Sequence, residues 1–129
     1  PFLKRRCVVP ISGFYEWCRE GGHKVPYFII PQAHDGLLLA GLWDRWYNAE
    51  AGQELLSFTI LTTAANENMK RLHHRQPVML SPEQALDWLD IDQPTAKLAY
   101  LFESRLPMDL SAIPVSVGTR QISKRLSPV

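Results

Sequence analysis

The sequence predicts an α+β domain built mostly from antiparallel strands. The first half of the chain consists of short runs rich in β-branched and aromatic residues, separated by turn signals such as Glu20-Gly21-Gly22 and His34-Asp35-Gly36. Helical signals follow in the second half. Strands that precede helices favour α+β over alternating α/β structure, and successive hairpins favour an antiparallel sheet.

The composition indicates one globular domain. The 129 residues are enough to bury a core, and no linker divides them, so we expect residues 1–129 to form a single domain. No apolar run approaches the roughly 20 residues of a membrane-spanning helix. Cys7 and Cys18 do not make a disulfide framework, and we expect reduced thiols in a cytoplasmic protein, associated with the nucleoid if it is bacterial.

Six strands are expected from the alternation of residue types. Gly41 lies inside the fourth strand, where a glycine indicates a bulge or a close approach of another backbone. The expected strands are Arg6–Pro10, Gly13–Arg19, Val25–Ile30, Leu37–Trp46, Leu55–Thr62 and, near the end of the chain, Ala112–Val117.

Three short helices are expected in the second half. They cover Ala64–Leu72, Ser81 to about Leu89, and Gln93 to about Ser104. Thr63 would be the N-cap of the first helix. The second has the strongest start signal, because Ser81 can cap it, Pro82 suits its first position and Gln84 completes a capping box.

Glu16 is the first candidate for a chemical role. It lies in a strand between Tyr15 and Trp17, and alternation places it on the opposite face, with Phe14 and Cys18. One interpretation is a solvent-facing glutamate on a half-exposed strand. The other is a carboxylate held beside apolar rings, where it can transfer protons.

His73 and Arg75 are the next candidates. They lie in a segment that Pro77 forces into an extended exit. A histidine there can act as a general acid or base, and an arginine two residues later can hold a phosphate. Alternatively, His73 and His74 are surface residues at a helix C-terminus, where the dipole favours them. Adjacent histidines without further ligands make a poor zinc site, so we expect no metal.

Three basic clusters raise the question of a nucleic-acid partner, although the net charge is only +1. They could be separate solvated patches, or they could form one phosphate-binding face. The clusters are Lys4-Arg5-Arg6, the segment from Lys70 to Arg75, and Arg120, Lys124 and Arg125.

The sequence contains no glycine-rich phosphate loop and no G-x-S-x-G elbow. A hydrolase that combines Cys18 with His73 and Glu16 is a weaker alternative, because Glu16 and Cys18 share one short strand.

Several segments together resemble the SOS response-associated peptidase (SRAP) family. Residues 5–17 are similar to its R-C-L-x-P-A-x-G-F/Y-Y-E-W core, and His73–Leu80 to its H-x-R-M-P-V-I/L-L segment. The other similar segments, in the family order, are Lys24–Tyr27, Ala40–Asp44, Phe58–Asn66 and Pro114–Val117. The resemblance covers nearly the whole chain and implies a strongly curved, barrel-like antiparallel sheet with a few short helices.

The resemblance also implies a function. Members of the family recognise abasic sites in single-stranded DNA and form a covalent thiazolidine crosslink through an N-terminal cysteine, which self-processing exposes. By position, Glu16 would shuttle protons, His73 would act on the sugar oxygen, and Arg75 would contact phosphate. We expect Lys4 and Arg6 to add DNA contacts, no cofactor to be needed, no membrane partner, and the complete protein to be monomeric.

Two departures from the family pattern affect these expectations. Gln76 replaces the usual methionine, a change expected to affect packing more than chemistry. The chain opens at Pro1, and only six residues precede Cys7, so we expect an N-terminally incomplete domain that lacks the nucleophilic cysteine and leaves strand edges unpaired. The alternative from another class is a non-catalytic module that binds single-stranded DNA.

Overall fold

The computed structural model describes residues 4–32 and 36–115. Within them, the α+β prediction is confirmed, because antiparallel strands dominate and the helices are short. The strands are β1 (Arg6–Ile11), β2 (Phe14–Glu20), β3 (His23–Pro31), β4 (Leu37–Asn48), β5 (Gln53–Ile60), β6 (Thr62–Ala64), β7 (Arg75–Pro77), β8 (Met79–Leu80) and β9 (Leu110–Pro114). The helices are α1 (Pro82–Leu89), α2 (Thr95–Leu98) and the 3₁₀ helix η1 (Ala99–Phe102).

The long strand β4 organises the first sheet. Its first half pairs with β1 on one edge and with β8, while its second half forms a hairpin with β5. At Gly41, a Cβ atom would come within 2.9 Å of the Thr59 carbonyl oxygen and 3.0 Å of the Cys7 sulfur. The predicted close approach at this glycine is therefore confirmed, since any side chain would push the neighbouring strands apart.

The second sheet has the order β2-β3-β9 and is antiparallel throughout. The β2–β3 turn contains Gly21 and Gly22 with φ of 54° and 81°, as the hairpin signal in the sequence predicts. Glu16 pairs with Tyr27 in this ladder. The predicted last strand ends earlier than expected, at Pro114. Its predicted final residues, from residue 116 on, lie outside the described residues, as do Arg120, Lys124 and Arg125.

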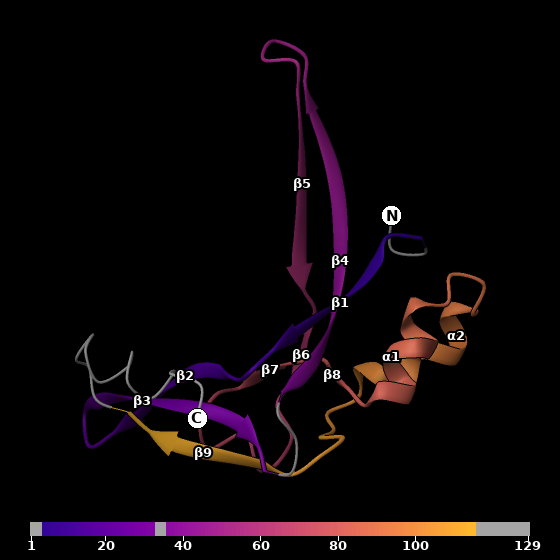
Figure 1. Cartoon of the computed structure of the whole chain (residues 1–129). Coiled ribbons are helices and arrows are strands. Elements are labelled where there is room, and N and C mark those ends of the chain that lie inside the picture. Colours follow the sequence, from indigo (N-terminus) through magenta and orange to yellow (C-terminus); the bar gives the residue numbers. More distant parts are fainter. Residues whose placement is uncertain (1–3, 33–35, 116–129) are drawn as a thin grey trace.

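A short ladder of β6 and β7 forms a third, two-stranded sheet (Figure 1). Backbone hydrogen bonds continue it into the first sheet: Leu61 N–H donates to Ala40, Val78 N–H to Leu61, and Ala40 N–H to Val78. The sheets curve around one another without closing, so the arrangement is barrel-like and open.

The helix predicted over Ala64–Leu72 is wrong, and so is Thr63 as its N-cap. Residues 62–64 pair with β7 instead, and the chain then forms successive turns over residues 67–72. The Asn66 side chain accepts a hydrogen bond from Asn68 N–H at 3.0 Å, a local bond that competes with helix formation. Thr63 is buried, and its hydroxyl donates to the Phe102 carbonyl.

The other two helix predictions are confirmed. In α1, the Ser81 hydroxyl accepts from Gln84 N–H, and the Gln84 side chain accepts from Ser81 N–H, which completes the predicted capping box. The helix expected from Gln93 to about Ser104 is divided into α2 and η1. None of the helices in the described part of the chain is long and apolar enough to cross a membrane.

Trp88 is the largest fully buried side chain. It anchors the core that joins α1, α2 and η1 to the first sheet, where Val78, Leu80, Leu98 and Leu101 are also buried. Its indole N–H donates to the Cys7 carbonyl at 2.9 Å, so the polar atom is satisfied. The helices are held to the sheet mainly by this apolar contact.

The β4–β5 hairpin projects away from the helices and from the second sheet (Figure 1). Its aromatic and aliphatic side chains stay exposed, including Trp46 and Leu56 at 58% and 65%. Within the described residues, β5 has a partner strand on one edge only, as expected for a sheet with unpaired edges.

Replacing Trp88 by alanine should destabilise the fold by about 3–5 kcal/mol, because the loss of the indole leaves a cavity in the main core. Replacing Trp46, an exposed tryptophan of the hairpin, should change the stability by about 0.5 kcal/mol or less. Urea unfolding followed by circular dichroism measures both. Equal effects of the two substitutions would contradict the described core.

Candidate active site

A cavity of about 630 Å³ opens between β2 and the segment that leads into β7. Glu16 lines it from one side and His73 and Arg75 from the other. The cavity thus brings together the three residues that the sequence singled out, and their chemical roles stay predictions. The remaining wall is largely apolar and includes Val9, Ile11, Phe14, Leu39, Phe58 and Ile60.

Glu16 reaches this cavity because β2 alternates its side chains as predicted. Tyr15 and Trp17 are exposed at 38% and 50%, whereas Cys18 on the Glu16 face is buried. Glu16 itself is half-buried and adjoins Phe14 in the cavity wall. The carboxylate therefore lies beside apolar groups at the cavity surface, where a proton acceptor can reach a bound molecule.

His73 is held by the backbone of Arg75. The Arg75 N–H donates to the Nδ1 atom of His73 at 3.1 Å, and the Arg75 carbonyl oxygen lies 3.2 Å from the same atom. With Nδ1 accepting, the neutral ring carries its proton on Nε2. The ring also stacks on His74 with 4.5 Å between centroids. Alternatively, Nδ1 carries the proton and donates it to the Arg75 carbonyl oxygen. Either bond holds the ring plane, and Nε2 has no hydrogen-bond partner among the described residues.

Arg75 is oriented by Thr62 across the β6–β7 ladder. Its Nη2 atom donates to both the carbonyl oxygen and the hydroxyl oxygen of Thr62, each at 3.0 Å. The side chain is exposed, and among the described residues it has no carboxylate partner. A guanidinium that is held at one nitrogen and otherwise unpaired is suited to bind an anion such as phosphate.

The two other predicted DNA contacts differ from each other. Lys4 is exposed, as a phosphate contact requires. Arg6 is only 5% exposed; its guanidinium donates to the Asp90 carbonyl at the end of α1 and lies 5.4 Å from the Trp88 ring centroid. Because this burial leaves almost no surface for a phosphate, we correct the expectation for Arg6 and assign it to the helix–sheet contact.

The cysteines do not form a catalytic pair with His73. Both thiols are free, and Cys18 lines a second cavity of about 510 Å³, which no histidine of the described residues lines. The Cys18 thiol donates to the Arg71 carbonyl at 3.1 Å. Burial raises the pKa of the Cys7 thiol, which disfavours the reactive thiolate. The cysteine-hydrolase alternative therefore has no support in this geometry.

Two residues of the site were not identified from sequence. Thr62 orients Arg75, and Gln76, a residue of β7 in the cavity wall, is buried with its amide hydrogen-bonded to two backbone groups. These contacts are structural and polar, and the expectation that Gln76 affects packing more than chemistry stays a prediction. The available signal was a polar residue at a position where the family pattern has methionine.

The fold and the cavity together define an α+β domain with open antiparallel sheets and a cavity that a glutamate, a histidine and an arginine line together. The family model described as "SOS response associated peptidase (SRAP)" matches residues 1–121. The chain therefore belongs to the SRAP family, as the sequence motifs indicated.

Similar proteins include the abasic site processing protein HMCES of Gallus gallus, 39% identical over 110 residues, and YoqW of Bacillus subtilis, 37% identical over 91 residues. Each match covers 70% of this chain, but only 33% and 40% of the relatives. A crystal structure of a protein from Bacteroides thetaiotaomicron aligns with a TM-score of 0.85 at 32% identity, covering 91% of this chain and 52% of that one. The chain thus spans a third to a half of the length of these proteins.

The neutral ring of His73 should be the Nε2–H tautomer, because its Nδ1 accepts the Arg75 amide proton. Ring ¹⁵N chemical shifts, measured above the titration of the ring, distinguish the two nitrogens. His23, an exposed residue of β3, serves as the control for an unconstrained ring. A proton on Nδ1 of neutral His73 would contradict this hydrogen bond.

Proposed function

We propose that this chain is the part of an abasic-site processing protein that binds single-stranded DNA at an abasic site and supplies the acid–base groups for its covalent capture. The observation that carries the proposal is the single cavity that Glu16, His73 and Arg75 line together. The names of the relatives, abasic site processing proteins, support the same substrate.

The proposed capture begins with ring opening of the abasic sugar. In its cyclic form the sugar is a hemiacetal without a free aldehyde, so as the ring opens, the ring oxygen gains a proton and the anomeric hydroxyl loses one to water. In its protonated form, His73 can deliver the proton to the ring oxygen from Nε2, while Nδ1–H faces the Arg75 carbonyl oxygen. Arg75 holds a flanking phosphate with a charge that does not titrate near neutral pH.

The covalent step uses an N-terminal cysteine that is not among the 129 residues. Its amine adds to the aldehyde carbon, water leaves, and an imine forms. The thiol then adds across the imine and closes a thiazolidine, so one water is released overall. Glu16 accepts a proton from the attacking amine and returns one to the departing hydroxyl. The same cavity would serve the self-processing that exposes the cysteine.

We place this activity in the response to DNA damage, in keeping with the name of the family. Lys4 adds a second backbone contact in this proposal. The proposal needs no cofactor or metal, and the complete protein acts as a monomer. The alternative, a binding module without covalent chemistry, predicts the same DNA affinity but no role for Glu16.

In a chain completed with the upstream cysteine segment, Glu16→Ala should slow crosslinking to abasic single-stranded DNA by about 10²-fold or more, since a positioned acid–base group is lost. Glu50→Ala, at the exposed tip of the β4–β5 hairpin, is the matched control and should leave the rate unchanged. The readout is the rate at which a denaturation-resistant adduct accumulates. A wild-type rate for Glu16→Ala would remove Glu16 from the mechanism.

Binding of the chain to single-stranded DNA should weaken as salt increases, with little dependence on base identity. Each phosphate contact contributes about 0.7 to the slope of log K against log salt. Arg75→Ala should therefore reduce the magnitude of that slope by about this amount for all sequences alike. Fluorescence anisotropy at several salt concentrations measures it, and an unchanged slope would show that Arg75 does not contact phosphate.

A further inference from the structure

A buried amide side chain, that of Gln76, belongs to a residue of the cavity wall next to Arg75. The Gln76 side chain is only 1% exposed. Its Oε1 accepts from Asn66 N–H at 2.8 Å, and its Nε2 donates to the Arg105 carbonyl at 2.7 Å. Both partners are backbone groups, one ten residues before Gln76 in the sequence and the other 29 residues after it. The Gln76 side chain therefore connects three separate segments of the chain.

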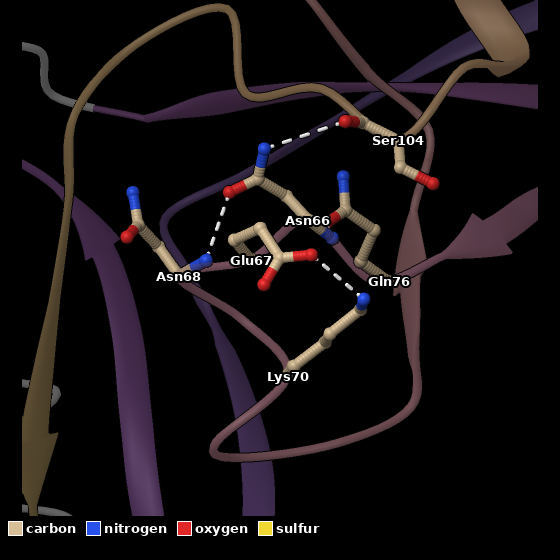
Figure 2. A network of polar contacts seen from close by, with 6 residues as sticks. All are labelled: Asn66, Glu67, Asn68, Lys70, Gln76 and Ser104. Atoms are coloured by element: carbon tan, nitrogen blue, oxygen red, sulfur yellow. Dashed lines mark hydrogen bonds and ion pairs between the residues drawn. The ribbon is translucent and has the colours of Figure 1, made fainter.

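The first partner, Asn66, fixes the loop that leads to His73. Its side chain accepts from Asn68 N–H at 3.0 Å and donates to the Ser104 carbonyl at 3.3 Å (Figure 2). Its own carbonyl accepts from the N–H groups of Met69 and Lys70, each at 2.9 Å. The loop over residues 65–74 therefore begins in a defined conformation.

The second partner, Arg105, is anchored to the start of α1. Its Nη1 donates to Gln84 Oε1 at 3.1 Å, and its Nη2 donates to the Met79 carbonyl at 3.0 Å. Gln84 is the residue that completes the capping box of α1 with Ser81. Through Arg105, the Gln76 amide is thus connected to a rigid part of the domain.

We propose that Gln76 is a positioning residue of the candidate site, which holds the β7 backbone so that Arg75 and His73 face the cavity. This inference rests on the proposed function. Gln76 follows Arg75 in the strand, so the two side chains point to opposite sides, one exposed and one buried. Fixing the Gln76 side chain fixes the plane of the strand, and with it the direction of Arg75.

Methionine, the usual residue of the family pattern here, can fill the same space but offers no strong donor or acceptor. In this chain it would remove the hydrogen-bond partners of Asn66 N–H and of the Arg105 carbonyl, both of which are part-buried, and unpaired polar groups away from water are costly. The loop would relieve that cost by shifting, and the shift would move Arg75 away from the phosphate.

The test compares Gln76→Met with Gln53→Met, a matched control at an exposed glutamine of β5. The probe is a labelled single-stranded oligonucleotide that carries one tetrahydrofuran abasic analogue. Gln76→Met should lower the affinity nearly as much as Arg75→Ala and should reduce the magnitude of the salt slope by about 0.7. Circular dichroism confirms that each variant is folded at the temperature of measurement.

A double variant separates positioning from general stability. If Gln76 acts through Arg75, adding Arg75→Ala to Gln76→Met should weaken binding no further, because the contact is already lost. Additive losses, or wild-type affinity of the folded Gln76→Met variant, would overturn the inference. If Arg75→Ala itself has no effect, the proposed phosphate contact fails instead, so the two failures are distinguishable.

Gln76→Glu supplies a second, independent readout. The ionised carboxylate can accept from Asn66 N–H but cannot donate to the Arg105 carbonyl, whereas the protonated acid can do both. The DNA affinity of Gln76→Glu, divided by that of the wild type at the same pH, should therefore increase as the pH falls. Groups that titrate in both proteins affect both affinities alike and cancel in this ratio. A ratio that does not change with pH would contradict a role for the donated hydrogen bond.

Discussion

The three-residue ladder between β6 and β7 is the constraint on which the candidate site depends. It pairs Thr62 with Pro77 and Ala64 with Arg75, and so closes the loop over residues 65–74. Ala65 N–H donates to the His74 carbonyl and continues this closure. Without the ladder, the histidine and the arginine would lie on an unconstrained loop, and the conformational entropy of that loop would oppose any fixed geometry opposite Glu16.

The cavity combines three groups whose properties complement one another. In the proposed mechanism, Glu16 is the proton acceptor on a strand, Nε2 of His73 is the proton donor, and Arg75 carries the permanent positive charge. Strand β2 carries Glu16, the Arg75 backbone holds His73, and Thr62 holds the Arg75 guanidinium, so positioning is divided between backbone contacts and a polar side chain.

Local signals predicted most of the fold, and non-local contacts account for the errors. The α1 start followed from Ser81, Pro82 and Gln84 alone, and the orientation of Glu16 followed from strand alternation. The helix expected over Ala64–Leu72 does not form, because residues 62–64 pair with β7, which follows the loop over residues 65–74. Likewise, Arg6 is buried against Trp88, a contact that no local pattern of charges reveals.

The central claim is that this chain holds the acid–base and phosphate-binding half of an abasic-site crosslinking protein, and adduct formation tests it most directly. Abasic single-stranded DNA is incubated with the 129-residue chain, and in parallel with the same chain extended upstream by the segment that begins with cysteine. After denaturing electrophoresis, we predict a covalent adduct for the extended protein and none for the chain alone. An adduct with the chain alone would place the nucleophile among these residues, and no adduct with the extended protein would contradict the account.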